Sequence, residues 1–123
     1  IATDVTIPGD HPGITKKEAS VEMGKGPVLG LASASGRGLL ADNRLVTWLR
    51  SAGDKMKIPY QLEVGDGGNT DASIINLVRD GIPSIPLSVP SRYIHSPVEV
   101  VDLKDVEATI DLLVEALKKK PKI

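Results

Sequence analysis

The chain has 123 residues, a length that suits one domain with a single core. Apolar residues make up 41% of it but aromatic residues only 2%, and phenylalanine is absent, so the core must be built from Ile, Val, Leu and Ala. The 15 basic and 16 acidic residues give a net charge of -1, which excludes a general electrostatic attraction to nucleic acid or to a membrane surface. The absence of cysteine excludes disulfides, thiolate metal sites and cysteine nucleophiles.

Several features bear on where the protein acts. No apolar run approaches the roughly 20 residues that a membrane-spanning helix needs, and no signal peptide is visible, so we expect a cytoplasmic protein. The basic run at 118–122 follows a predicted helix and favours a solvated tail over a binding patch. The chain opens without methionine in a strand-like run, and we therefore expect it to be a piece of a longer protein.

The first third of the chain predicts strands. Residues 1–7 are rich in β-branched side chains and predict a buried strand, which Asp4 interrupts. A carboxylate in such a run is costly unless it is paired, hydrogen-bonded or bound to a metal. A turn-dense loop follows, then short strands at 21–26 and 27–32 and a small, polar loop at 33–38.

A helix and a strand are predicted next. Asp42 or Asn43 caps the helix, which ends at 57–59. Its apolar residues recur at helical spacing and are expected to form one buried stripe of Leu45, Leu49, Ala52 and Met56. Residues 60–64 alternate in polarity and predict a strand.

A glycine-rich loop at 65–71 leads into a second predicted helix. Thr70 or Asp71 caps that helix and Gly81 ends it. The backbone N–H groups of such a loop can face a ligand, although the phosphate-loop and dinucleotide fingerprints are both absent. A tight turn from strand to helix is the alternative interpretation.

The next stretch delivers a histidine. An apolar run at 82–89 leads into Arg92-Tyr93-Ile94-His95-Ser96, and a second apolar run follows at 98–101. Strands that deliver one histidine to a loop can hold a metal ligand or an acid–base group rigidly, and a hydrogen-bonded structural histidine is the alternative.

A last helix begins at Asp102 and Asp105 in an arrangement like a capping box. Its apolar face is predicted to consist of Val106, Ile110, Leu113, Val114 and Leu117. The elements thus alternate between strand and helix, and the strands are too apolar to have a wet face. This order predicts an α/β fold with a layered, largely parallel sheet and flanking helices.

Asp4 and His95 are the residues that we expect to act together, because strand ends on one side of a sheet can converge on a crevice. Zinc accepts both carboxylate and imidazole, but a catalytic zinc site normally has three protein ligands. His11, Asp66 and Glu99 are further candidates without other support. The alternative is a serine hydrolase, for which no nucleophile-elbow motif is present and whose nucleophile would be Ser73, Ser88 or Ser96.

Four segments carry a resemblance to a known family. They are Ile1-Ala2-Thr3-Asp4-Val5-Thr6 with Gly9-Asp10-x-Pro12-Gly13, Gly24-Lys25-Gly26-Pro27, Gly67-Gly68-Asn69-Thr70-Asp71-Ala72, and Ser88-Val89-Pro90-Ser91-Arg92-Tyr93-Ile94-His95-Ser96 with Glu99. Together they cover nearly the whole chain, which resembles the C-terminal part of the tetrahedral (TET) aminopeptidases, also called glutamyl or deblocking aminopeptidases or cellulase-M-like proteins. The resemblance implies the C-terminal part of a zinc-exopeptidase-like catalytic domain.

The resemblance also implies roles for single residues. Asp4 would bind one of two divalent metal ions, zinc or cobalt in the complete enzyme, and His95 would bind the other. The residues that would lie near the N-terminal residue of a bound peptide are Gly67, Gly68, Thr70 and Asp71. Arg92, in the segment that carries His95, is grouped with them as a candidate for substrate binding.

Other parts of the family pattern do not occur in this sequence. The His-x-Asp segment, the Asp that bridges the metals, the Glu-Glu pair with the general base and the inserted dimerisation domain all lie upstream of the Asp4 strand in family members. The resemblance therefore covers only their last part, and it implies no catalytic acid or base in this chain.

Three functions follow as hypotheses. The first is part of a dinuclear aminopeptidase that releases N-terminal residues from peptides with a metal-activated water. It would be inactive alone, it would need the missing N-terminal part of the enzyme, and it would form homo-oligomers, which are tetrahedral dodecamers in the family. The second is a non-catalytic truncated subunit or assembly module. The weakest is an endoglucanase, because sugar clefts usually have aromatic platforms and the chain has one Trp and two Tyr.

Overall fold

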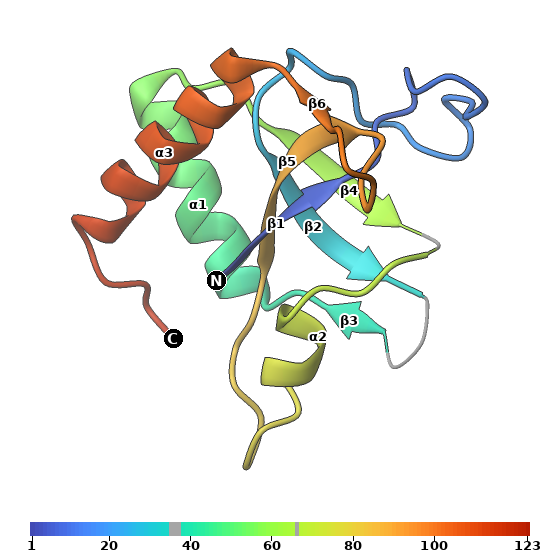
Figure 1. The fold of residues 1–123 in the computed structure, drawn as a ribbon. Helices are drawn as coiled ribbons and strands as arrows, with labels where there is room; N and C mark the ends of the chain where they lie inside the picture. Colours follow the sequence, from blue (N-terminus) through green and yellow to red (C-terminus); the bar gives the residue numbers. More distant parts are fainter. Residues whose placement is uncertain (35–37, 66) are drawn as a thin grey trace.

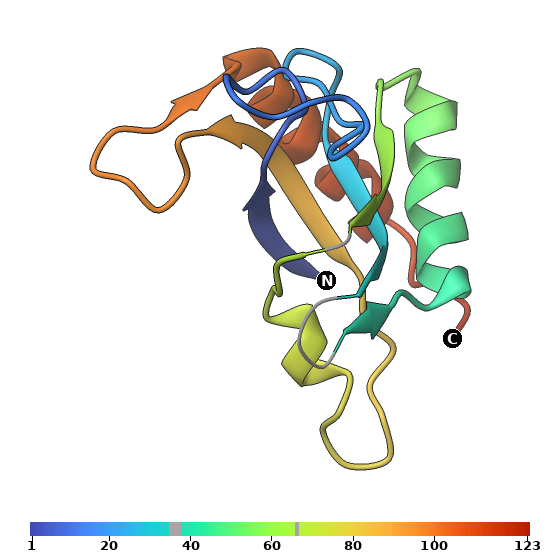
Figure 2. The ribbon, with the colours of Figure 1, turned by 90° about the vertical axis from the view of Figure 1, so that its right-hand side faces the viewer.

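The computed structural model describes residues 1–34, 38–65 and 67–123. Its two long helices, α1 (Asn43–Met56) and α3 (Leu103–Leu117), pack against each other on one side of a sheet (Figures 1 and 2). The predicted α/β layering is therefore confirmed. Among the described residues, no helix is both long and apolar enough to cross a bilayer.

The strand order of the sheet is β1 (Ala2–Thr6), β5 (Pro86–Arg92), β2 (Val28–Ser33) and β3 (Leu39–Leu40). In addition, β4 (Gln61–Gly65) pairs with β2, and β6 (Val100–Val101) pairs with β5. The β1–β5 and β2–β4 pairs are parallel, whereas β2–β5, β2–β3 and β5–β6 are antiparallel. The expectation of a largely parallel sheet holds for the two longest ladders, but the sheet is mixed because β2 runs against its neighbours β5 and β3.

The sheet is strongly curled. β1 and β4 are separated by β5 and β2, yet the Thr6 hydroxyl on β1 donates a hydrogen bond to Glu63 on β4, with 2.9 Å between Oγ1 and Oε1. The sheet thus has a convex and a concave side. β1 lies at its edge and buries only Ala2, so the predicted strand is confirmed but its full burial is not.

The main core lies between the sheet and the two long helices. Its fully buried members are Leu29, Leu49, Ile85, Leu87 and Leu112, and burial of each side chain contributes about 1.5–3 kcal/mol. On α1, whose N-cap is Asp42, the predicted stripe is confirmed at Leu45, Leu49 and Ala52. Met56, the last residue of the helix, is 52% exposed instead.

Helix α3 buries a face that differs in part from the predicted one. Ile110, Val114 and Leu117 are more than half exposed, whereas the buried residues are Asp105, Thr109, Leu112, Glu115 and Ala116. The polar members of this face have partners. The Asp105 carboxylate accepts the N–H groups of Gly24 and Gly26, and Glu115 binds two lysines. Of the predicted face, Val106 and Leu113 are half-buried, and Leu113 packs against the core. Burial of satisfied polar groups is tolerated, so apolar spacing alone identifies the buried face only in part.

The structure corrects the sequence interpretation in three other places. Residues 21–26 form a loop rather than a strand, α2 (Ala72–Ile75) is a single turn rather than a helix to Gly81, and β3 has no counterpart in the prediction. Asp71 stands at the N-cap of α2 without a side-chain hydrogen bond. Part of the loop predicted at 33–38 lies outside the described residues.

Candidate functional site

The concave side of the sheet encloses a hollow of about 520 Å³. Successive strand residues point to opposite faces, so the neighbours of core residues such as Leu29 and Leu87 turn toward this hollow. The strand residues that line it include Asp4, Thr6, Gly30, Ala32, Glu63, Gly65, Pro86 and Ser88. Gly30 is required there, because a Cβ at this position would lie 2.5 Å from Cγ of Pro86. The expectation that no sheet face would be wet is therefore wrong.

Asp4 is a half-buried residue of β1 that lines the pocket. The parallel register sets it beside Ser88 of β5, which also lines the pocket. Its Oδ1 accepts a hydrogen bond from the N–H of Val5 at 2.8 Å, which fixes one oxygen of the carboxylate. This contact leaves the other oxygen of the Asp4 carboxylate without a protein donor among the described residues.

His95 lies in the loop between β5 and β6 and also lines the pocket. Figure 2 shows this loop projecting beyond the strands. His95 is exposed, and both His95 and Tyr93 have positive φ angles, 64° and 63°. Residues other than glycine seldom adopt this conformation, and it clusters at functional sites. The fold thus brings Asp4 and His95 to one pocket from opposite ends of the chain.

These two residues fit a metal only as part of a ligand set. Carboxylate and imidazole are suitable ligands for zinc, but one metal normally needs three or four. Within 1–34, 38–65 and 67–123, no three His, Cys, Asp or Glu residues form a group that could hold a metal ion. Asp66, a candidate from the sequence, lies outside the described residues.

The loop before α2 forms another wall of the pocket. Gly67, Gly68 and Thr70 line the hollow, and the Ser33 hydroxyl of β2 fastens the loop by donating to the Gly68 carbonyl at 2.7 Å. The buried Oγ1 of Thr70 has no hydrogen-bond partner in the part of the chain that the structure describes. Asp71 is exposed and is not a lining residue.

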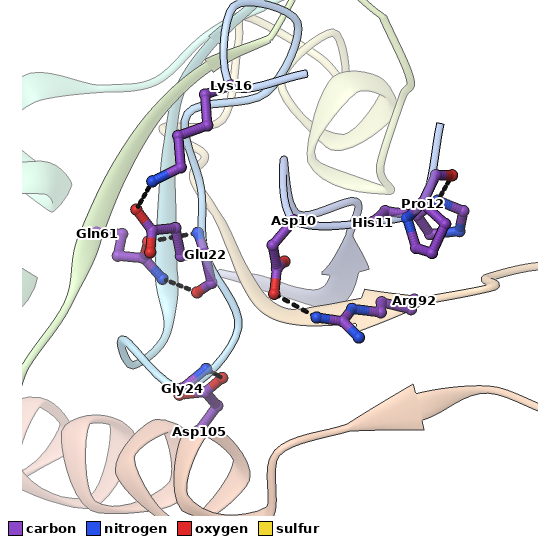
Figure 3. A network of polar contacts seen from close by, with 9 residues as sticks. All are labelled: Asp10, His11, Pro12, Lys16, Glu22, Gly24, Gln61, Arg92 and Asp105. Atoms are coloured by element: carbon purple, nitrogen blue, oxygen red, sulfur yellow. Dashed lines mark hydrogen bonds and ion pairs between the residues drawn. The ribbon is translucent and has the colours of Figure 1, made fainter. Parts of the chain in front are cut away.

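Arg92 lies beside the pocket wall rather than in it. Its guanidinium forms an ion pair with Asp10, which joins the end of β5 to the loop after β1 (Figure 3). The rings of His11 and Tyr93 meet edge to face, with centroids 4.9 Å apart, and make a second contact between these segments. Burial raises the pKa of Asp10, but the hydrogen bond and charge of Arg92 outweigh this and lower the pKa below its usual value.

Glu63 is a pocket residue that the sequence analysis missed. It lies on β4, it is half-buried, and the Thr6 hydroxyl donates to its carboxylate. Desolvation raises the pKa of Glu63 above its ordinary value, although the hydrogen bond from Thr6 opposes the shift. The only sequence signal was the alternation of polarity in 60–64, which sets Gln61 and Glu63 on one side of the strand.

Comparison with known proteins assigns the family. Residues 1–112 match the M42 glutamyl aminopeptidases, and the chain belongs to this family. The lysyl aminopeptidase of Pyrococcus furiosus is 36% identical over 125 residues, which cover 96% of this chain and 33% of that protein. The resemblance inferred from the sequence motifs is thereby confirmed.

Solved structures agree with this assignment. An aminopeptidase from the archaeon Desulfurococcus kamchatkensis is 45% identical with a TM-score of 0.83, over 94% of this chain and 32% of that one. A TET aminopeptidase from a marine sediment archaeon of the Thaumarchaeota is 38% identical with a TM-score of 0.88, over 98% and 33% of the two chains. The chain therefore spans about a third of the length of its relatives.

One similar structure concerns assembly. A TET1 peptidase from Pyrococcus horikoshii, which is described as able to assemble into a tetrahedron or a large octahedral shell, is 35% identical with a TM-score of 0.65. The match covers 81% of this chain and 28% of that one.

Proposed function

We propose that this chain forms part of the active site of a dinuclear metal-dependent aminopeptidase that releases N-terminal residues from peptides. The observation that carries the proposal is the convergence of Asp4, His95 and the Gly67–Thr70 loop on one pocket in a chain of the M42 family. Asp4 would bind one metal ion and His95 the other.

The two metal ions, zinc or cobalt, would supply a Lewis acid and lower the pKa of a bound water. The remaining ligands and the general base would come from residues outside these 123. This chain's own contribution would be one ligand to each ion and one wall of the substrate pocket. By itself the chain would be inactive.

The residues proposed to bind substrate are Gly67, Gly68, Thr70, Asp71 and Arg92. The support is strongest for Thr70, because a buried hydroxyl without a partner among the described residues is suited to bind a polar group of a ligand. Asp71 and Arg92 do not line the pocket, and a role for Arg92 would be exercised through its ion pair with Asp10.

Association into a homo-oligomer is part of the proposal and is supported by the assemblies described for the Pyrococcus horikoshii relative. The alternative is a truncated subunit without catalytic activity. Such a subunit would still associate with other copies, but its Asp4 and His95 would not serve a catalytic metal site. The endoglucanase alternative has little support, because the described pocket lining contains no Trp or Tyr.

The test is a chimaera in which this chain replaces the matching third of the Desulfurococcus kamchatkensis aminopeptidase. We expect the chimaera to cleave an aminoacyl anilide in the presence of zinc or cobalt, and the 123-residue chain alone to show no activity. Asp4→Asn and His95→Gln should each abolish activity and reduce the bound metal measured by mass spectrometry under native conditions.

Asp111→Asn is the matched control, because Asp111 is exposed on α3 and outside the pocket. Full activity of Asp4→Asn or His95→Gln at unchanged metal content would contradict the ligand assignment. Activity of the isolated chain would contradict the claim that the general base lies elsewhere.

A further inference from the structure

The loop that carries His95 has an uncommon backbone conformation at two of its residues. Both Tyr93 and His95 have positive φ angles. The left-handed conformation is uncommon for residues other than glycine, although histidine adopts it more often than most, so this loop conformation depends on contacts that favour it. Side chains that contact the backbone of this loop are therefore of interest.

The stem of the loop is the short antiparallel ladder between β5 and β6. Ser91 pairs with Val101 and Arg92 pairs with Val100, and Ser91 is fully buried. This ladder fixes the two ends of residues 93–99, but its register does not include His95. A second element is needed to hold the tip.

Glu99 supplies that contact. Its Oε1 accepts a hydrogen bond from the N–H of His95 at 3.1 Å, and its Oε2 lies 3.3 Å from the hydroxyl of Ser91. The same hydroxyl lies 3.4 Å from the carbonyl oxygens of Arg92 and Val100. One carboxylate thus bridges the buried stem of the loop and the peptide N–H of the residue at its tip.

We propose that Glu99 is a positioning residue for His95, whose carboxylate holds the His95 peptide in the left-handed conformation from which this residue lines the pocket. The inference deepens the proposed function, because it gives Glu99 a purpose only if His95 binds a metal ion. Glu99 itself is not among the residues that line the pocket. The carboxylate is directed at its own loop, which distinguishes it from a third metal ligand.

The bond between Glu99 and the His95 N–H can be tested in the 123-residue chain by NMR. The readouts are the strong NOE between amide and α proton that a positive φ produces, and the amide exchange rate of His95. Glu99→Ala should lose this NOE and exchange roughly tenfold faster, as expected for the loss of one hydrogen bond to a carboxylate. Glu99→Gln retains an oxygen that can accept the N–H, and it should rescue both readouts.

Two further variants serve as a control and as a substitute for Glu99→Ala. Glu107→Ala removes an exposed glutamate from α3 and should leave His95 unchanged. Glu99→Asp retains the charge but shortens the side chain, so it should lose the His95 contact partially and can replace Glu99→Ala if that variant fails to fold. Unchanged NOE and exchange in Glu99→Ala or, failing that, in Glu99→Asp would overturn the proposal.

The chimaera adds a functional readout. Glu99→Ala should raise the metal concentration for half-maximal activity on the order of tenfold, as do other changes to groups that orient metal ligands, while KM at saturating metal stays unchanged. Glu99→Gln should restore the wild-type metal requirement. Equal losses in Glu99→Ala and Glu99→Gln, with the His95 NOE retained in both, would overturn the proposal in favour of Glu99 as a ligand.

A mixed result separates the two proposals. If Glu99→Ala loses the His95 NOE while the metal requirement stays at the wild-type value, the positioning of His95 by Glu99 is supported. The same result would overturn the assignment of His95 as a metal ligand.

Discussion

Carboxylates on the two sides of the sheet differ in how many hydrogen-bond partners they have. On the helical side, Asp105 is fully buried and accepts two backbone N–H groups, and Glu115 binds both Lys55 and Lys118. On the concave side, the hydroxyl of Thr6 is the one hydrogen-bond donor to the carboxylate of Glu63 among the described residues. The paired groups of the helical side stabilise the fold, whereas the Glu63 carboxylate is less completely hydrogen-bonded among the described residues.

The pKa values of Glu115 and Glu63 are shifted in opposite directions. Hydrogen bonds from Lys118 and Lys55 lower the pKa of Glu115 to about 2. Desolvation raises the pKa of Glu63. Pairing with a cation favours the charged carboxylate, and burial without a cation disfavours it, which accounts for the opposite signs of the two shifts.

The largest expected difference in the free energy of unfolding is between substitutions of two adjacent residues on β5. Leu87 is fully buried toward the helices, and Ser88 lines the pocket. Leu87→Ala should lower the free energy of unfolding by about 2–5 kcal/mol, because it leaves a cavity in the core. Ser88→Ala should cost about 1 kcal/mol or less. Urea denaturation measures both, and equal losses would refute the contrast between the two sides.

A smaller loss is expected from the polar anchor of the helical side. Asp105→Asn leaves one oxygen to serve the N–H groups of Gly24 and Gly26, so one buried donor loses its acceptor. The expected cost is about 2 kcal/mol in the free energy of unfolding. Asp111→Asn, on the exposed face of α3, is the control and should change stability little. A loss no larger than that of the control would show that the loop at 21–26 does not depend on Asp105.

The smallest effects concern pH, and their signs differ. The folded pKa of Glu115 is depressed, so its stabilisation is present above about pH 4.5 and is lost as pH falls toward about 2. The folded pKa of Glu63 is raised, so any advantage of the native state is present below about pH 4.5 and is lost as pH rises through the folded value. Relative to wild type, Glu115→Gln should therefore lose most stability near neutral pH, and Glu63→Gln should gain there. Denaturant titrations from acidic to neutral pH measure both differences, and slopes of the same sign would contradict the assignment.

Much of the fold could be predicted from local patterns, and the failure at α3 has an identifiable cause. The bounds of α1 follow from the Asp42 cap and the spacing of Leu45 and Leu49. The buried face of α3 could be found only in part in this way, because Asp105 is satisfied by backbone groups of Gly24 and Gly26, far away in the sequence. The spacing of apolar residues along a helix cannot reveal hydrogen-bond partners that are distant in the sequence.

The candidate site was predictable to a similar extent. The motifs identified Asp4, His95, Gly67, Gly68 and Thr70, and all five line one pocket. Their roles stay predictions. The contribution of Glu63 depends on the curl of the sheet, and that of Glu99 depends on the turn of a loop. Neither can be read from spacing along the chain.

The pairing of β1 with β5 has a consequence for the order of folding. The ladder runs from Ala2 beside Pro86 to Thr6 beside Pro90, so it joins segments separated by most of the chain. The entropy of closing so long a loop must be spent before any of these contacts forms, and such non-local contacts slow folding. Helices α1 and α3 can form locally, whereas the wall that carries Asp4 depends on the whole chain being gathered. The position of the strand that carries Asp4 therefore depends on a contact between distant parts of the chain, and loss of the β1–β5 pairing would displace Asp4 directly.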